Sequence, residues 1–488
     1  MPDEETLDPG EWSSLQTLGR RMVDDMLAYL ETVRERPVWQ PVPADVQVRL
    51  DQPMPRDGQG AEQAYSDFLD LVLPYPFGNI HPRHWGWVNG TGTPMGMLAE
   101  MLAAGMNPNT GGFHQAATLV EAQVLRWCKE MLGYPNGASG LLLSGGSMAN
   151  LVGLTVARNV KAEVDIRRSG VAAAPRMMTA YCSDETHSSV QKAVELLGLG
   201  SQSLRQLPAD SDFRLDPAAL EMAVAEDRAA GRHPFCVIGN AGTVNTGASD
   251  PLDALADICE RENLWLHIDG AFGALAALSP ELRPAVKGME RADSVAFDLH
   301  KWMYMPYEVG CILVRDEAHH RGAFALTPAY LTKAEGTVAD SPWMADYGVQ
   351  LSRGFRALKV WMGIKEHGVD KYARLIEQNV AQARYLAGLV RDKPELELLA
   401  PVPLNIVCFR FAADGQDEAT RNEINHQILV HLHKSGTAVP SSTQLAGRFA
   451  IRVAITNHRT RLEDLDLLVS AVIMEGNRLT GVQRDALA

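Results

Sequence analysis

Short apolar runs alternate with longer segments of helical periodicity in the middle of the chain. The apolar runs lie at residues 141–143, 177–182, 235–239, 264–268, 294–297 and 311–314. Segments long enough for a helix lie between several of them, at 150–162, 187–198, 217–230 and 252–262. Strands that alternate with helices in this way are typical of a mainly parallel sheet with helices on both faces. The pattern therefore predicts an α/β fold.

The two ends of the chain have different patterns. Near the N-terminus, apolar residues three or four apart predict an amphipathic helix over residues 12–36, and a proline-rich connector follows. The apolar face of this helix should pack on the body of the protein or on a second subunit. After about residue 355, long helical patterns lead to strand-like runs at 404–411 and 449–455 and to a final helix near 462–474.

These patterns divide the chain into three expected parts. Residues 1–80 form an N-terminal helical segment. Residues 81–370 form a large domain with the main sheet. Residues 371–488 form a smaller C-terminal α/β domain.

Composition narrows the possible partners. Hydrophobic residues make up 46% of the chain and charged residues 22%, as in an ordinary globular protein. The net charge of −15 would repel nucleic acid and an anionic membrane surface, so we expect neither as a partner. The six cysteines are scattered without a CxxC pair, so no metal site is expected. Reduced thiols and the lack of a secretory signal indicate a cytoplasmic protein.

The first candidate for chemistry is the segment SGGSMAN at residues 144–150, where a strand turns into a helix. Ligands of an open α/β sheet bind at such carboxyl ends of strands. The glycines permit a tight turn, and the helix N-terminal amides and the Ser147 hydroxyl would suit a phosphate group. A plain turn with a serine cap explains the segment equally well.

The same segment is also compatible with a different class of enzyme. Residues 145–149, GGSMA, nearly match the G-x-S-x-G nucleophile turn of serine hydrolases, although the second glycine is missing. No HGGG-type segment precedes it either. From these residues alone, a serine esterase that uses Ser147 remains an alternative.

Three further candidates follow apolar runs. Asp269 in HIDGA could pair with a cationic ring nitrogen. Lys301 in DLHKW precedes apolar residues, and an amine kept partly neutral by such surroundings can form a Schiff base with an aldehyde. His187 in DETHSSV could lie flat on an aromatic ring. Taken singly, each also fits an ordinary role: a strand-ending carboxylate, a surface lysine and a partly exposed histidine.

Together and in this order, the four features match the parts of one cofactor. Pyridoxal phosphate (PLP) has a phosphate, an aromatic face, a ring nitrogen and an aldehyde, and each needs one of these partners. A serine hydrolase would leave Asp269 and Lys301 unexplained. The motifs resemble those of the group II PLP decarboxylases, which include aromatic-L-amino-acid, histidine and glutamate decarboxylases. The resemblance runs from about residue 15 to about residue 480.

This resemblance implies the fold-type I, aspartate aminotransferase-like architecture. Such proteins have an N-terminal helical segment that embraces a partner, a large PLP-binding domain with a seven-stranded sheet and a small C-terminal domain. They assemble as homodimers with active sites at the interface. The resemblance also implies PLP as the cofactor and an amino acid as the substrate, which loses carbon dioxide to give an amine.

Matching the motifs by position implies a role for each candidate residue. Lys301 corresponds to the Schiff-base lysine, Asp269 to the partner of the pyridine nitrogen and His187 to the histidine that stacks on the ring. The other implied cofactor contacts are Gly146 and Ser147 at the phosphate, Thr243 in the segment beneath the cofactor, and His300 next to the lysine.

Tyr330 in LTPAYL bears on the type of reaction. It coincides with the mobile-loop tyrosine that returns a proton to the carbanion after carbon dioxide leaves. Relatives with phenylalanine at this position tend to be aldehyde synthases, so the resemblance favours simple decarboxylation. A packed loop aromatic is the alternative role for Tyr330.

The sequence departs from the family pattern at two places. Asp298 stands where animal aromatic decarboxylases have asparagine, and an aspartate that faced the phosphate would repel it. Either Asp298 turns away or other groups supply the phosphate contact. The segment FHQAA at 113–117 also differs from the proline-containing pocket loop of relatives, which weakens any inference of the substrate.

The candidates for the substrate pocket are His84, Trp85, Trp87 and Phe113. The three large aromatic side chains would suit a flat, apolar substrate. Trp85 and Trp87 lie two residues apart on one expected strand face, so core packing explains them equally well. We expect an aromatic L-amino acid as the substrate, with an acidic amino acid or histidine as alternatives.

Overall fold

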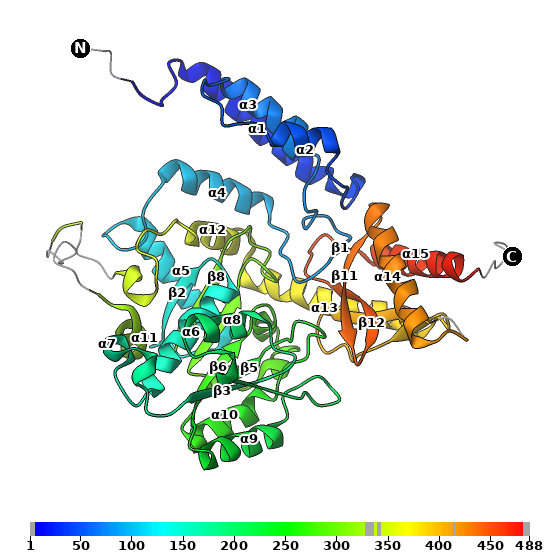
Figure 1. Cartoon of the computed structure of the whole chain (residues 1–488). Helices are drawn as coiled ribbons and strands as arrows, with labels where there is room; N and C mark the ends of the chain where they lie inside the picture. Colours follow the sequence, from blue (N-terminus) through cyan, green and yellow to red (C-terminus); the bar gives the residue numbers. More distant parts are fainter. Residues whose placement is uncertain (1–4, 327–335, 339–342, 413–414, 482–488) are drawn as a thin grey trace.

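The computed structural model describes residues 5–326, 336–338, 343–412 and 415–481. Figure 1 shows a group of N-terminal helices, a large α/β domain and a smaller α/β domain that contains the C-terminal helices. The predicted α/β class is confirmed.

A seven-stranded sheet forms the centre of the large domain. Its strands are β2 (Ser139–Leu143), β3 (Met178–Ser183), β4 (Leu204–Leu207), β5 (His233–Asn240), β6 (Trp265–Asp269), β7 (Ser294–Asp298) and β8 (Gly310–Val314). They lie in the order β2-β8-β7-β6-β5-β3-β4. β8 is antiparallel to both its neighbours, and the other pairs are parallel. Every predicted run falls on a strand, whereas the polar edge strand β4 has no apolar run to predict it.

Both faces of this sheet are buried, which explains its continuous apolar strands. On β2, Leu142 joins the apolar cluster on one face, while Leu141 and Leu143 join the cluster on the other. Val237 and Ile238 alternate in the same way on β5. The helices of this domain are α4 (Pro94–Met106), α5 (Ala116–Leu132), α6 (Gly146–Lys161), α7 (Ile166–Ser169), α8 (Ser189–Leu196), α9 (Pro217–Ala229), α10 (Leu252–Glu262), α11 (Glu317–Phe324) and α12 (Ala357–His367).

The smaller domain is built on a five-stranded sheet in the order β1-β11-β12-β10-β9. Its elements are α13 (Val369–Arg391), β9 (Leu396–Leu398), β10 (Ile406–Phe411), α14 (Glu418–Lys434), β11 (Val439–Leu445), β12 (Arg448–Ala454) and α15 (Leu462–Thr480). The strand β1 (His84–Trp85) pairs in parallel with β11. His84 and Trp85, which the prediction placed in the large domain, therefore belong to the sheet of the small domain. The sequence could not predict this, because a strand of two residues leaves no pattern of apolar and polar positions. The three-part division otherwise stays a prediction.

Three helices precede the large domain: α1 (Trp12–Glu31), α2 (Ala44–Leu50) and α3 (Ala61–Asp67). Figure 1 shows them apart from the main body of the chain. Only Leu18 and Tyr29 of α1 are buried, whereas Trp12 and Leu15 are exposed. The apolar face of α1 is therefore largely uncovered in the described chain. None of the helices described is long and apolar enough to cross a lipid bilayer.

We expect the fold to lose stability as the pH falls from 6.5 towards 4. Burial lowers the pKa of His267 and of His320 from 6.5 to about 4. Between these values the unfolded chain binds protons that the folded chain does not, so the free energy of unfolding rises with pH. Each pKa unit corresponds to about 1.4 kcal/mol.

Denaturant unfolding at several pH values would measure this effect. His320→Gln should flatten the pH dependence, because it removes one buried histidine of α11. Its neighbour His319 has a half-exposed side chain, so His319→Gln is the matched control and should leave the dependence unchanged. A free energy of unfolding that does not change over this pH range would contradict the prediction.

Candidate active site

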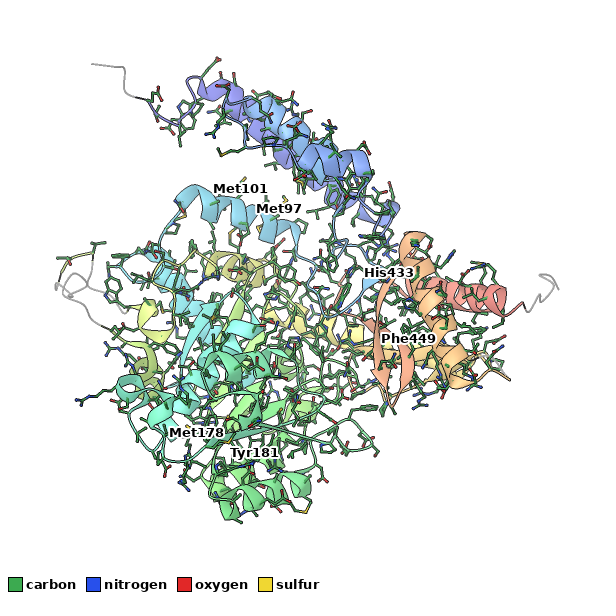
Figure 2. The ribbon with its side chains drawn as sticks, in the orientation of Figure 1. Met97, Met101, Met178, Tyr181, His433 and Phe449 are labelled. Carbon is green, nitrogen blue, oxygen red and sulfur yellow. The ribbon has the colours of Figure 1, made fainter. Side chains whose placement is uncertain are left out.

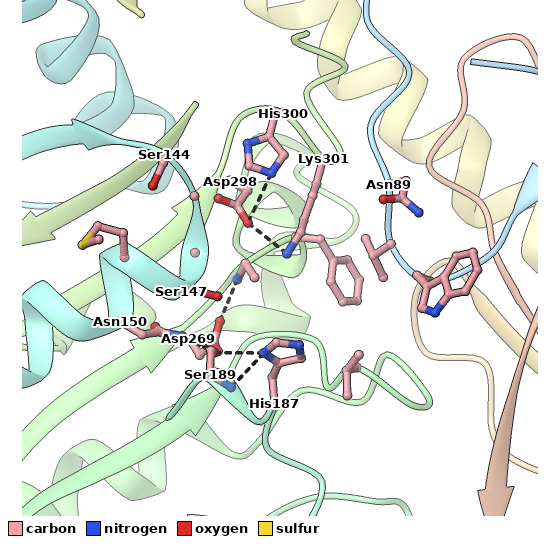
Figure 3. A pocket seen from close by; sticks show the side chains of 18 of the residues that line it. Asn89, Ser144, Ser147, Asn150, His187, Ser189, Asp269, Asp298, His300 and Lys301 are labelled. Carbon is pink, nitrogen blue, oxygen red and sulfur yellow. Dashed lines mark hydrogen bonds and ion pairs between the residues drawn. The ribbon is translucent and has the colours of Figure 1, made fainter. Parts of the chain in front are cut away.

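A cavity of about 790 Å³ opens at the carboxyl ends of the central strands (Figure 3). Segments that follow β2, β3, β6 and β7 meet there, as the parallel topology requires. The structure thus brings together predicted site residues that lie far apart in the sequence. They are Gly146, Ser147, His187, Asp269, His300 and Lys301.

Lys301 lies directly beyond β7, and its amine faces Asp298 (Figure 3). The distance from Nζ to Oδ2 of Asp298 is 2.9 Å. Burial lowers the pKa of Lys301, but the charge and hydrogen bond of Asp298 outweigh it, so the pKa lies above its ordinary value. Asp298 therefore favours the charged amine, and the prediction of a partly neutral amine has no support from this geometry.

Asp298 lies at the phosphate end of the predicted site and does not turn away from it. A Cβ atom on Gly146 would lie 2.9 Å from Oδ2 of Asp298. Nε2 of His300 is 3.8 Å from the same carboxylate, and burial lowers the pKa of this histidine. Lys301 balances the charge of Asp298. Because a carboxylate cannot donate a hydrogen bond to a phosphate, contacts to a phosphate must come from other groups.

The N-terminus of α6 supplies such groups. The helix begins at Gly146, and no side chain caps it. Its first backbone N–H groups and the positive end of its dipole therefore remain available to an anion in the cavity. Ser147 is exposed beside them. These donors fit a phosphate group.

Asp269 ends β6 inside the cavity and is 5% exposed. Its Oδ2 accepts a hydrogen bond from Nδ2 of Asn150 at 2.8 Å, and Oδ1 accepts one from the backbone N–H of Ala271 at 3.1 Å. A carboxylate oxygen has two lone pairs, so Asp269 can still accept a proton-bearing ring nitrogen from the cavity. This geometry fits the role implied for Asp269.

His187 is held at one ring nitrogen. Its Nδ1 accepts hydrogen bonds from the hydroxyl and the backbone N–H of Ser189, at 2.9 and 3.2 Å. Burial lowers the pKa of His187, which favours the neutral imidazole. The ring is therefore fixed in the cavity wall, as stacking on a flat ligand requires.

The sequence did not indicate the opposite wall of the cavity. Asn89 and Tyr307 form part of it, and the Tyr307 hydroxyl donates to Oδ1 of Asn89 at 2.9 Å. Next to Asn89, a Cβ atom on Gly90 would lie 1.5 Å from the carbonyl oxygen of His300. Only glycine permits this approach. The run NGTG at 89–92 was the available signal, since such a run of small residues permits close backbone contact.

The structure separates the two tryptophans of the predicted pocket. Trp85 lies in the core of the small domain, 1% exposed, and its indole N–H donates to Oγ1 of Thr460 at 3.2 Å. The pocket role predicted for Trp85 is wrong. Trp87 lines the cavity and is 52% exposed. Its left-handed backbone (φ 55°) breaks the strand, so the two side chains do not share a face as expected.

His84 and Phe113 do not line this cavity within the described chain. His84 packs against Phe77, with ring centroids 4.8 Å apart. Phe113 packs against Trp343, with ring centroids 5.1 Å apart. Their predicted contact with the substrate is therefore not made by the single chain.

Thr243 also differs from the prediction. Its hydroxyl lies 3.2 Å from that of Thr246, and the side chain is buried within its own turn. The neighbouring Gly242 and Val244 line the cavity instead. The prediction that Thr243 contacts the cofactor is therefore wrong for its side chain, and its two neighbours take this place in the cavity wall. Tyr330 lies outside the described residues.

A serine hydrolase needs a base within hydrogen-bond reach of its nucleophile. No hydrogen bond joins Ser147 to a histidine in the part of the chain that the structure describes. His187, in the same cavity, is held by Ser189. The esterase alternative therefore has no support from this geometry.

The chain matches a known family over most of its length. The sequence model described as "Pyridoxal-dependent decarboxylase conserved domain" matches residues 43–412. The chain belongs to this family. It is a PLP-dependent amino acid decarboxylase, as the motifs around Lys301 and Asp269 predicted.

Similar proteins agree with this assignment. The chain is 35% identical to "Aromatic-L-amino-acid decarboxylase" of Bacillus atrophaeus, over 92% of this chain and 93% of that protein. It is 31% identical to "Tyrosine decarboxylase 4" of Petroselinum crispum, over 92% and 90%. The crystal structure of Oryza sativa TDC with PLP and tryptamine matches with a TM-score of 0.90 at 28% identity, over 97% and 100%. The expected fold-type I architecture is confirmed.

Proposed function

We propose that this decarboxylase acts on an aromatic L-amino acid and releases the corresponding amine and carbon dioxide. The observation that carries the proposal is the meeting of Lys301, Asp269 and His187 in one cavity at the strand ends. The similarity to an aromatic-L-amino-acid decarboxylase and a tyrosine decarboxylase supports the choice of substrate class.

Bound PLP supplies an electron sink for the electron pair that remains on the substrate when carbon dioxide leaves. Lys301 provides the amine that attaches the aldehyde, and Asp298 orients its Nζ atom. Asp269 holds the proton at the ring nitrogen, an electrostatic arrangement made before the bond breaks. His187 orients the ring from one face.

The remaining contacts complete the proposed site. The N–H groups at the start of α6, with Gly146 and Ser147, bind the phosphate, and His300 supports that end of the cavity. From the family resemblance, Tyr330 returns the proton to the α-carbon of the substrate. A tyrosine there favours amine formation over aldehyde formation.

The lining of the cavity favours an aromatic side chain over an acidic one. Trp87, Phe272 and Val244 give it apolar surface. Among the described lining residues, Lys301 is the one lysine or arginine, and it is committed to Asp298. Glu308 would repel a second carboxylate. An acidic amino acid would therefore lack a cation for its side chain.

We also propose a homodimer. Figure 2 labels Met97 and Met101 on the side of α4 that faces the N-terminal helices. Met101 is 51% exposed, and Trp12 and Leu15 of α1 are exposed as well. Exposed apolar side chains on separate elements, as here on α1 and α4, are typical of a protein interface.

We further propose a cytoplasmic location. The six cysteines are all buried and free, which supports this expectation.

A panel of L-amino acids tests the proposed substrate. The purified holoenzyme should release carbon dioxide from an aromatic amino acid at least about tenfold faster than from glutamate or histidine, because one lost pocket contact is worth about that much. An aminotransferase would instead form a keto acid without releasing gas. Faster carbon dioxide release from glutamate or histidine would overturn the aromatic assignment.

A further inference from the structure

Behind Asp269 lies a buried chain of hydrogen bonds that reaches away from the cavity. Nδ2 of Asn150 donates to Asp269, as described above, and Oδ1 of Asn150 lies 3.0 Å from Nε2 of His267. Nδ1 of His267 lies 2.8 Å from the hydroxyl of Ser294, which also accepts from the indole N–H of Trp265 at 2.8 Å. All of these side chains except that of Asp269 lie behind the cavity wall or at its edge.

The direction of each hydrogen bond in this chain is fixed. The carboxylate of Asp269 can only accept, so the amide of Asn150 presents its NH₂ group to Asp269 and its Oδ1 to Nε2 of His267, which must donate. Burial lowers the pKa of His267 to about 4, so its ring is neutral and its single proton lies on Nε2. That proton is donated to Oδ1 of Asn150. Nδ1 of His267 therefore accepts from the hydroxyl of Ser294, and His267 holds the Asn150 amide in this orientation.

The NH₂ group of Asn150 serves two residues of the site at once. One N–H donates to Asp269 at 2.8 Å, and the other donates to the hydroxyl of Ser189 at 3.1 Å. The same hydroxyl donates to Nδ1 of His187. Asn150 is 1% exposed, so water cannot replace either contact. Figure 3 shows Asn150 beside Asp269 and Ser189.

A glycine of α6 leaves the space that the His267 ring occupies. His267 is fully buried, and a Cβ atom on Gly153 of α6 would lie 2.6 Å from its Cε1 atom. The glycine one turn after Asn150 therefore makes room for the imidazole that orients the Asn150 amide. A flipped amide would place its oxygen against the Asp269 carboxylate, which has no proton to donate to it.

We propose that Asn150 is a positioning residue for Asp269, and that His267 sets the orientation of its amide. This inference rests on the proposed function, because it concerns how Asp269 meets the ring nitrogen of PLP. Asn150 lines the cavity beside Asp269 and acts through that residue. Without this contact, Oδ2 of Asp269 loses its donor and the carboxylate keeps the hydrogen bond from the backbone N–H of Ala271, so its orientation toward the ring nitrogen is less well fixed.

Reconstitution with two cofactors tests the proposal. Apoprotein of the wild type and of Asn150→Leu is loaded with PLP or with PLP methylated at the ring nitrogen, whose positive charge needs no proton. With PLP, Asn150→Leu should lower kcat about ten- to a hundredfold, the range of a lost hydrogen bond to a charged group. With the methylated cofactor, the difference from the wild type should largely disappear. An equal loss with both cofactors would overturn the proposal.

A second readout does not depend on activity. Quenching of tryptophan fluorescence on titration of the apoprotein gives the dissociation constant of each cofactor. Asn150→Leu should weaken binding of PLP about tenfold and binding of the methylated form less. The matched control is Asn159→Leu, because Asn159 lies on the same helix and bonds Arg158 rather than the site. It should bind both cofactors as the wild type does.

Two further variants separate this role from loss of structure. Ser189→Ala removes the hydroxyl that donates to Nδ1 of His187 and accepts the second N–H of Asn150, but it keeps the contact of Asn150 to Asp269, so it should cause equal losses with both cofactors. His267→Gln can still donate to Asn150, whereas His267→Leu cannot, so glutamine should restore most of the activity with PLP. Equal activity of these two variants would contradict the role of His267.

The outcome for the wild type distinguishes the two proposals. A wild-type protein that binds no PLP and releases no carbon dioxide from any aromatic amino acid contradicts the proposed function. A wild type that does both, next to an Asn150→Leu variant with the same deficit for each cofactor, contradicts only the role of Asn150.

Discussion

Lys301→Ala should abolish both decarboxylation and the covalent attachment of PLP. The amine of Lys301 is the nucleophile of the proposed site, and it lies in the cavity beside Asp298. Without it, the cofactor is held only by its phosphate, its ring face and its ring nitrogen. We expect the rate of carbon dioxide release to fall about a thousandfold or more, as for the loss of other groups that transfer protons or form bonds.

Two measurements test this prediction: the rate of carbon dioxide release, and the site at which borohydride fixes the cofactor to the chain. Borohydride reduction of the wild type should leave a pyridoxyl group on one peptide, the one that contains Lys301, and mass spectrometry should find none in Lys301→Ala. Lys301→Arg keeps a positive charge against Asp298 but has no usable amine, so it should be equally inactive. Lys287, exposed and paired with Asp253, gives the control Lys287→Ala, which should be active. A pyridoxyl group on another lysine would refute the assignment.

Much of this site could be predicted from the sequence because the sheet is mainly parallel. Its strands are buried on both faces and appear as apolar runs, and their carboxyl ends meet at one edge. Residues directly after such runs, such as Asp269 and Lys301, therefore had to lie near one another. The chemistry of PLP then explained both residues together, which no single motif could do.

The contacts that the sequence did not reveal depend on side-chain direction. The sequence left open whether Asp298 turns away from the phosphate or other groups bind it, and the structure pairs Asp298 with Lys301, three residues later. Trp87 has a left-handed backbone that removes it from the face of Trp85. Neither feature leaves a pattern of apolar and polar positions.

Long-range polar pairs were equally hidden. In the sequence, Asn150 is the last residue of the segment SGGSMAN at 144–150, and His267 lies inside an apolar run. Neither position indicated a polar partner. Their hydrogen bond joins α6 to β6 and becomes visible only when both elements are placed. The same holds for β1, whose two residues pair with a strand of the small domain.

Asp269→Asn should lower kcat about a hundredfold to a thousandfold, the cost of removing one preorganised electrostatic contact from an active site. Asparagine keeps the size of the side chain, but its single oxygen can accept from only one of Asn150 and Ala271, which donate to different oxygens of Asp269. It loses the negative charge that holds a proton on the ring nitrogen. The KM for the amino acid should change less than kcat, because the charge acts when the bond breaks.

Asp293→Asn is the matched control. Asp293 accepts from the backbone N–H of Leu266 at 2.8 Å, at the opposite end of the β6 and β7 pair, and should affect stability but not kcat. The cofactor methylated at its ring nitrogen again separates the explanations. Because its charge is permanent, it should restore much of the activity of Asp269→Asn. If Asp269→Asn remains equally inactive with the methylated cofactor, Asp269 acts by some means other than its charge at the ring nitrogen.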